Sequence, residues 1–282
     1  MPELEKCRKI LIEVNQTCNL NCSYCFYRDY GRIKSLLTVA DIVNMLKICP
    51  NANEFFLTGG ECFTSPNIQS IIELLSKKGE ITIFTNGIII GKYDENTFNK
   101  IVNLVNRFII SFDSFDFVNY HNRDRLKETL FTIKRILKIS QEKVEVKVCI
   151  TNQNSSELKS IFQTLINLGV KYLSINFVFD IKNSLINHEV KSLSKLEEIF
   201  QVITEYKEYF NEKYIETLKS LYLENKVNMK YPCLADQKYY YLDCANNYLI
   251  CPGNNKEIGN RGDWMKCYSK ECANEWEIMY KR

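Results

Sequence analysis

Short apolar runs alternate with longer amphipathic segments between residues 9 and 178. The apolar and β-branched runs predict six strands, at residues 9–14, 54–58, 81–85, 107–112, 144–150 and 172–178. The segments between them predict five helices, at residues 38–48, 66–77, 95–105, 124–139 and 155–168. Two helix starts are marked. Thr38 with Asp41 resembles a capping box, and Ser65 before Pro66 predicts a cap with proline in the first turn.

This alternation predicts an α/β fold with a parallel sheet. Six strands joined by right-handed crossovers suit a partial (β/α)6 barrel of the TIM type, whose working end lies at the carboxyl edges of the strands. Periodicity alone allows a doubly wound sheet equally well. On the fifth strand, we expect the end that begins at Ile150 to face the pocket and Cys149 to lie on the opposite, buried side.

The chain changes character twice after residue 178. Residues 193–227 are rich in Glu and Lys and carry an apolar stripe, which predicts one or two helices packed on the barrel as a structural bridge. A helix that binds a partner is the alternative. After Tyr231 and Pro232 the composition shifts to cysteine, tyrosine and turn residues. We therefore predict two domains, 1–227 with the barrel and bridge and 228–282 as a small cysteine-rich extension.

Composition narrows the class of protein. The 282 residues suffice for one large α/β domain with a small appendage, and a hydrophobic content of 45% supports a sizeable core. The formal net charge is only +3, so no nucleic-acid footprint is predicted. The N-terminus lacks a signal-peptide core and no apolar run reaches the length of a membrane span, so we expect a cytoplasmic protein. In a reducing compartment, clustered cysteines more often bind metal than form disulfides.

Three cysteines gather just after the first predicted strand. Cys18, Cys22 and Cys25 lie within one short loop. Three thiolates can hold three irons of a [4Fe-4S] cluster and leave the fourth iron open to bind and reduce another molecule. A structural zinc site or a disulfide pair is the alternative. Zinc would need a fourth ligand, however, and residues 27–37 supply neither Cys nor His.

With this C-x3-C-x2-C spacing, and Tyr24 directly before the last cysteine, the sequence resembles the radical S-adenosylmethionine (SAM) superfamily. The resemblance favours the partial barrel over roughly residues 9–178. It implies that the three cysteines hold a [4Fe-4S] cluster whose open iron chelates the amino and carboxylate groups of SAM. One electron, from a flavodoxin or ferredoxin type of donor, then cleaves SAM to a 5'-deoxyadenosyl radical that abstracts a hydrogen atom from the substrate.

Polar motifs at the ends of the next strands match the family's SAM-binding elements in order. A Gly-Gly-Glu element ends the second strand, Thr-Asn-Gly the third and Ser-x-Asp the fourth, and His-Asn-Arg follows. Taken singly, the Thr-Asn-Gly and Ser-x-Asp elements also read as turn residues. The resemblance implies contacts with SAM or substrate for Tyr24, Gly59, Gly60, Glu61, Asn86, Ser111, Asp113 and Arg123. The family usually has proline after the glutamate. Here Cys62 follows, which we read as a packed thiol, with a reactive thiol near the SAM pocket as the alternative.

The C-terminal region resembles the twitch or abbreviated SPASM extension of radical SAM enzymes. Two tyrosine-rich runs flank Asn246 and Asn247 and predict a hairpin whose turn has Asn where the family usually has glycine. The resemblance implies an auxiliary [4Fe-4S] cluster with four ligands, Cys233, Cys251, Cys267 and Cys272. A zinc ribbon built from the same residues is the alternative. Cys244 is left over as a substitute ligand, a packed thiol or a hydrogen-atom donor. The conceivable bases or donors are Asp180, Asp236, Asp243 and Cys244.

The extended members of this family largely modify ribosomally made peptides, by thioether or carbon-carbon crosslinking, dehydrogenation or epimerisation. We therefore expect a radical SAM oxidoreductase that acts on such a peptide. Such enzymes often carry a small peptide-recognition domain before the cysteine loop. Because the loop begins at Cys18 here, we expect a leader peptide to be bound elsewhere or by a separate protein. The alternatives are a dehydrogenase of a small carbohydrate or alcohol and, from another class, a non-catalytic metal-binding scaffold.

Overall fold

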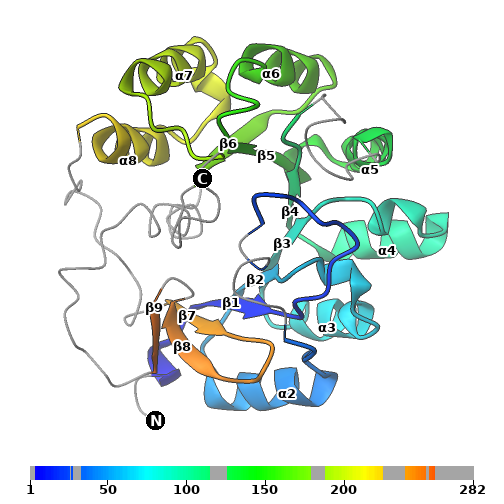
Figure 1. Ribbon diagram of the computed structural model, residues 1–282. Helices are drawn as coiled ribbons and strands as arrows, with labels where there is room; N and C mark the ends of the chain where they lie inside the picture. Colours follow the sequence, from blue (N-terminus) through cyan, green and yellow to red (C-terminus); the bar gives the residue numbers. More distant parts are fainter. Residues whose placement is uncertain are drawn as a thin grey trace.

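Among the residues that the structure describes, one sheet of nine strands runs in the order β6-β5-β4-β3-β2-β1-β7-β8-β9 (Figure 1). The computed structural model describes residues 4–25, 27, 33–114, 126–178, 188–224, 239–251 and 254–257. The strands are β1 (Lys9–Glu13), β2 (Glu54–Thr58), β3 (Glu80–Thr85), β4 (Arg107–Ser111), β5 (Val144–Ile150), β6 (Tyr172–Phe177), β7 (Tyr239–Leu242), β8 (Tyr248–Cys251) and β9 (Asn254–Glu257). The pairings from β6 through β1 to β7 are parallel, and β8 and β9 add antiparallel strands.

The strand order decides between the two predicted architectures. The first six strands lie side by side in chain order, so every crossover moves the chain in the same direction and places its helix on the same face. A doubly wound sheet would reverse at a switch point. The helices line the outer, convex side of the curved sheet in Figure 1. They are α2 (Val39–Ile48), α3 (Ile68–Leu75), α4 (Glu95–Leu104), α5 (Leu126–Ile139), α6 (Leu158–Asn167), α7 (Leu193–Glu205) and α8 (Glu212–Tyr222). The prediction of an α/β fold with an open, partial barrel is confirmed.

The start of α2 is confirmed and the start of α3 is corrected. The backbone N–H of Asp41 donates to Thr38 Oγ1 (3.2 Å) and that of Thr38 donates to Asp41 Oδ2 (2.8 Å), which completes the capping box. The predicted cap at Ser65 is wrong, because α3 begins only at Ile68. Ser65 instead has extended backbone at the end of the short 3-10 helix η2 (Cys62–Thr64), which delays entry into the helix.

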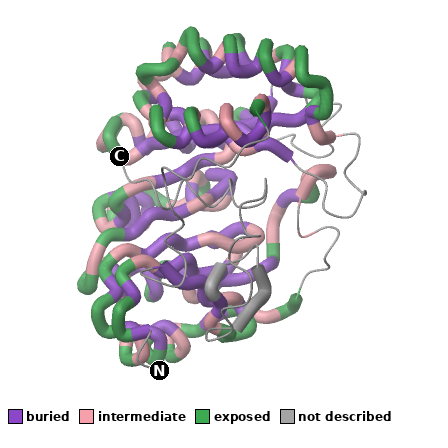
Figure 2. Tube along the Cα trace, turned by 90° about the vertical axis from the view of Figure 1, so that its left-hand side faces the viewer, coloured by how far each residue is buried: buried purple, intermediate pink, exposed green. Residues whose placement is uncertain are grey.

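Alternation along the strands separates an apolar outer face from a more polar inner face. On β5, Val144, Val146, Val148 and Ile150 are all fully buried in the core that the helices cover. Figure 2 shows buried residues concentrated on the strands and exposed residues along the outer side of the helices. The inner face of β5 therefore carries Glu145, Lys147 and Cys149. The predicted orientation of the end of this strand is thus wrong, because Ile150 packs in the core and Cys149 is only partly buried.

Two helices follow β6 and close that side of the barrel. Within the segment predicted as a structural bridge, α7 packs on the core through four buried residues, Leu196, Ile199, Phe200 and Ile203, and the bridging role stays a prediction. On α8, the Tyr214 hydroxyl donates to the backbone oxygen of Ile175 (2.6 Å) in β6. Among the described residues, no helix has the length and apolar character needed to cross a membrane.

The predicted C-terminal hairpin forms and joins the barrel sheet. β7 pairs in parallel with β1, from Lys9 opposite Tyr239 to Ile12 opposite Leu242, and β8 returns antiparallel to it. Asn246, in the turn, has a φ of 67°, as expected of an Asn that replaces glycine. The predicted domain boundary near residue 227 lies outside the described residues and stays a prediction.

Candidate active site

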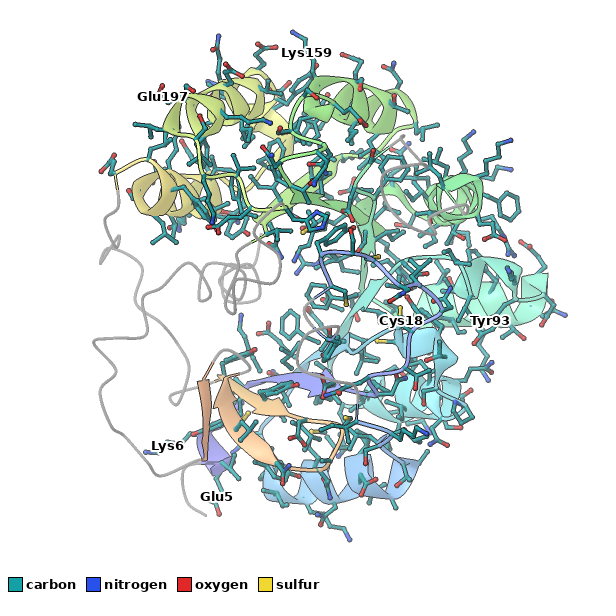
Figure 3. All side chains as sticks on the ribbon, in the orientation of Figure 1. Glu5, Lys6, Cys18, Tyr93, Lys159 and Glu197 are labelled. Carbon is teal, nitrogen blue, oxygen red and sulfur yellow. The ribbon has the colours of Figure 1, made fainter. Side chains whose placement is uncertain are left out.

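The cysteine loop leaves the carboxyl end of β1 and crosses the carboxyl ends of the neighbouring strands. In Figure 1 this dark blue segment reaches toward β4 before the chain returns to α2, and Figure 3 labels Cys18 on it. Within the described part of the chain, Cys18, Cys22 and Cys25 form no disulfide, and each is partly exposed. Among the described residues, no three His, Cys, Asp or Glu side chains converge closely enough to hold a metal ion.

The donors on this loop nevertheless fit an iron-sulfur group. Three thiols lie within eight residues, and thiolates are the usual ligands of such clusters. Beside them, Asn19 Nδ2 and Ser23 Oγ are buried with no hydrogen-bond partner among the residues that the structure describes. Buried polar atoms without partners are uncommon, and a bound group is one way to satisfy them. Cys18, Cys22 and Cys25 would hold the cluster, once their thiols converge.

The Gly-Gly-Glu element seats the cysteine loop. The N–H of Gly60 donates to the oxygen of Asn15 (2.8 Å), and the N–H of Glu61 donates to the oxygen of Thr17 (2.8 Å). A Cβ on Gly59 would lie 2.2 Å from the oxygen of Asn15, and one on Gly60 would lie 2.4 Å from that of Thr17. Both positions thus require glycine because the backbone of the cysteine loop lies against them. This packing role is additional to the close approach of a ligand that the sequence predicted.

Glu61 ties the Gly-Gly-Glu element to the Thr-Asn-Gly element. Its carboxylate accepts from Thr85 Oγ1 (2.7 Å), from the N–H of Asn86 (2.7 Å) and from the N–H of Phe63 (3.2 Å). Burial raises the pKa of this carboxyl, and the three hydrogen bonds oppose the shift. Sequence reasoning placed Glu61 on the ligand, whereas its carboxylate is already engaged within the protein.

Asn86 and Ser111 line one cavity at the carboxyl ends of β3 and β4. Its wall is mostly apolar, formed by Leu20, Asn86, Ile88, Ser111, Phe112, Leu126 and Thr129. Asn86 Nδ2 also donates to Asn19 Oδ1 (2.8 Å), so the cavity borders the cysteine loop. An apolar wall with a few polar groups is typical of a small-molecule site.

Asp113 holds the cysteine loop rather than an open ligand position. The Tyr24 hydroxyl donates to its Oδ2, and the N–H of Cys149 donates to its Oδ1 (2.8 Å). The ring of Tyr24 packs edge-on against His188, with 6.1 Å between centroids. The structure thus brings Tyr24 and Asp113 together, and His188 joins them from a segment that no sequence motif marked.

Lys147 is a functional candidate that sequence reasoning missed. It lies on the inner face of β5, directly opposite Ser111 of β4 in the sheet register, and is 9% exposed. Its ammonium lies 4.9 Å from the ring centroid of Phe84. The alternation of β5 carried the signal: apolar residues occupy every second position from Val144 to Ile150, and Lys147 lies between them, on the opposite face of the strand.

Several predicted site residues lie outside the described residues: His121, Arg123, Asp180, Cys233, Asp236, Cys267 and Cys272. Cys251 ends β8. Their roles stay predictions. Asp243 is described, and its Oδ1 accepts from the backbone N–H groups of Ala245 and Asn247, so it holds the hairpin turn.

The remaining thiols differ in their surroundings. Cys62 is fully buried, and burial raises its pKa well above the usual value, which supports the packed thiol over the reactive one. Cys7 and Cys49 are also buried. Cys244 lies in the hairpin turn at 3% exposure, where burial and then the nearby Glu13 carboxylate raise its pKa to about 12.

Sequence relatives cover most of the chain. It is 25% identical to the GTP 3',8-cyclase of Clostridium perfringens over 270 residues, which is 93% of this chain and 74% of that protein. It is 27% identical to the antilisterial bacteriocin subtilosin biosynthesis protein AlbA of Bacillus subtilis over 183 residues, which is 60% of this chain and 39% of that protein.

Solved structures share the fold. SuiB of Streptococcus suis bound to SAM superposes with a TM-score of 0.67 at 14% identity, covering 88% of this chain and 60% of that one. SuiB bound to its precursor peptide SuiA gives a TM-score of 0.68 at 13% identity, covering 98% of this chain and 67% of that one. The family model for the radical SAM superfamily matches residues 12–165, which span the cysteine loop and the strand-end motifs. The chain is therefore an enzyme of the radical SAM superfamily, whose members bind SAM and a [4Fe-4S] cluster.

Proposed function

We propose that this enzyme modifies a ribosomally made peptide, using the hydrogen abstraction that a [4Fe-4S] cluster and SAM supply when bound. The observation that carries the proposal is the likeness to AlbA, a bacteriocin biosynthesis protein, at 27% identity over 60% of the chain. SuiB, which shares the fold, has been solved with a precursor peptide bound. Net reactions consistent with this class are crosslinking, dehydrogenation and epimerisation.

The geometry supports specific roles for the residues at the barrel mouth. Cys18, Cys22 and Cys25 hold the cluster. In this proposal the adenosyl part of SAM binds at the mostly apolar wall that carries Asn86 and Ser111, and the small cavity there widens to take it. Lys147, beside Ser111 on the inner face, is placed to pair with a carboxylate such as that of SAM.

The C-terminal region contributes an auxiliary [4Fe-4S] cluster in this proposal, with Cys233, Cys251, Cys267 and Cys272 as ligands. The proposal gives Cys244 no ligand role, which is supported by its burial in the hairpin turn beside the Glu13 carboxylate. A buried, protonated thiol can remain a packing residue or serve as a hydrogen-atom donor. Replacing Cys244 by Ala should keep the iron content and SAM cleavage. Loss of iron would make Cys244 a ligand.

A second candidate is a nucleotide substrate. Several GTP 3',8-cyclases align over a larger share of the chain than AlbA does, 93% in the Clostridium perfringens enzyme against 60% for AlbA. A buried lysine on the inner face of the barrel would also suit an anionic substrate. This alternative predicts that GTP, and not a peptide, stimulates turnover of SAM.

The deciding experiment begins with anaerobic reconstitution of the protein and of a Cys18/Cys22/Cys25 triple alanine variant. About eight irons per chain, falling to about four in the variant, are expected for two [4Fe-4S] clusters. The reduced wild type should cleave SAM, and the products with GTP and with a precursor peptide encoded beside the gene are compared by mass spectrometry. A peptide that changes mass, or that gains one deuterium when the reaction is run in D₂O as epimerisation requires, supports the first proposal, and a cyclised nucleotide would replace it. No SAM cleavage at all would favour the non-catalytic scaffold.

A further inference from the structure

A buried carboxylate at the carboxyl end of β1 joins two parts of the chain that are far apart in sequence. Glu13 is 1% exposed. Its Oε2 accepts from Gln16 Nε2 (3.2 Å) and from the backbone N–H of Cys244 (3.2 Å), 231 residues away. Its Oε1 accepts from the Tyr27 hydroxyl. None of the strand-end motifs includes this residue.

The contacts of Glu13 bracket the three cysteines. Gln16 precedes Cys18, and Tyr27 follows Cys25. Gln16 Oε1 in turn accepts from the N–H of Ile33 (2.8 Å), where the chain returns toward α2. The segment before Cys18 and the segment after Cys25, the two limbs of the cysteine loop, are thus both held by the Glu13 carboxylate. Gln16 and Tyr27 bond to it directly, and Ile33 is linked to it through the side-chain amide of Gln16.

The groups that face Glu13 are donors. Burial, followed by the charge of Glu13, raises the pKa of the Tyr241 hydroxyl and of the Cys244 thiol, so both stay protonated at neutral pH, and the Tyr27 hydroxyl donates to Glu13. Tyr241 and Cys244 also hydrogen-bond to Glu13 through their side chains. A carboxylate has only acceptor atoms and can therefore accept from all of these donors. A glutamine at this position would point its NH₂ group at one or more of them, and that hydrogen bond would be lost.

We propose that Glu13 is a positioning residue that clamps both limbs of the cysteine loop and ties them to the C-terminal hairpin. Its consequence for the cluster rests on the proposed function, but the clamp itself is a property of the chain without metal. Hydrogen bonds to a charged group are among the stronger ones in proteins, and several buried ones converge here. Through this contact, the hairpin that begins the C-terminal region helps to set the shape of the loop that carries the thiols.

The test uses Glu13→Gln in the full chain without metal, followed by amide hydrogen exchange. We expect exchange about tenfold faster than wild type in residues 14–25 and also in residues 239–249, because both segments lose a bond to the same charged acceptor. Glu145→Gln is the matched control. Glu145 is an equally buried carboxylate, paired with Arg107 at the amino end of β5. This variant should leave both segments at the wild-type rate relative to global unfolding. Faster exchange in neither segment, or in only one, would overturn the clamp.

A second readout reports on the loaded protein. Glu13→Gln should keep its iron, but the electron paramagnetic resonance spectrum of its reduced cluster should differ from wild type after SAM is added, whereas Glu145→Gln should match wild type. An unchanged spectrum would limit Glu13 to the fold and remove its positioning role.

If Glu13→Gln does not fold, Tyr27→Phe removes one donor, and faster exchange is expected in the cysteine loop alone. An unchanged rate there would contradict the clamp. Failure of the wild type to cleave SAM would refute the proposed function and leave the exchange result standing.

Discussion

At the scale of single residues, the strand-end motifs serve the protein's own packing as much as a ligand. Glu61 and Asp113 each resemble a ligand-binding carboxylate, yet each accepts hydrogen bonds from within the chain. Gly59 and Gly60 are needed because the backbone of the cysteine loop lies against them. These residues therefore support the backbone of the cysteine loop, which carries the three thiols.

Gly60→Ala tests this role of the glycines. The new Cβ would lie 2.4 Å from the oxygen of Thr17, so the loop must shift, and we expect the free energy of unfolding to fall by about 2 kcal/mol. Gly79→Ala is the matched control. Its Cβ would lie 2.0 Å from the oxygen of Asn53, at the amino ends of β2 and β3 and away from the cysteine loop. Urea titration should show both losses, but only Gly60→Ala should lower iron retention at the cysteine loop. Equal iron content in the two variants would contradict the seating role.

The thiols provide a second test at this scale. Cys62 is fully buried with a raised pKa, so little thiolate exists below pH 9 and no reagent reaches it. In the native protein without metal, iodoacetamide at pH 8 should label Cys18, Cys22 and Cys25 and spare Cys62 until urea is added. Peptide mass spectrometry reads each site. Labelling of native Cys62 at the rate of the loop cysteines would restore the reactive-thiol alternative.

At the scale of elements, local sequence signals worked where their partners were near in the chain. The capping box of α2 formed because Thr38 and Asp41 are three residues apart. The cap expected at Ser65 failed because the 3-10 helix before it, which no pattern indicated, delays α3 until Ile68. Helix boundaries thus depended on what preceded each helix.

Thr38→Ala measures the capping box. Loss of the side-chain acceptor for the Asp41 N–H should lower the free energy of unfolding by about 1 kcal/mol. Ser140→Ala is the control, because Ser140 precedes a short 3-10 helix, η4 (Gln141–Lys143), without a capping bond and should change stability by less than about 0.5 kcal/mol. Urea midpoints compare the two. A loss of similar size in both variants would show that the box adds nothing.

At the scale of the whole molecule, the C-terminal hairpin belongs to the same sheet as the barrel. β7 pairs with β1 along four residues, and Tyr240 and Leu242 pack into the main core. A separate extension would instead place its own core apart from the barrel. The proposed domain at 228–282 thus includes three strands, β7 to β9, that share the barrel's sheet.

This shared sheet predicts shared cooperativity. Slowly exchanging amides of β7 should open with the same free energy as those of β1, within about 1 kcal/mol, because the two strands separate together. Native-state hydrogen exchange at low urea measures both. The β4 amides serve as the reference, since β4 lies inside the barrel sheet. Much weaker protection in β7 than in β1 would mark the hairpin as an independent unit.

The sequence by itself determined the elements, the fold class and the family. Strand and helix periods are local, and two strands, at 54–58 and 144–150, were predicted to the residue. The C-x3-C-x2-C loop and the motifs after β2, β3 and β4 needed only their spacing and order, and the family model over residues 12–165 agrees with them.

Only the tertiary structure decided which of these groups are already engaged and which new ones join them. The bond from Cys244 to Glu13 spans 231 residues, and Lys147 reaches the inner face opposite Ser111 through the register of β4 and β5. The period of one strand indicates which residues share a face, but which strand lies beside it and in which register depends on the neighbouring strands and the connections between them. This is why the sequence indicated a cysteine loop with strand-end motifs, while the carboxylate that ties the loop to the C-terminal hairpin emerged only from the fold.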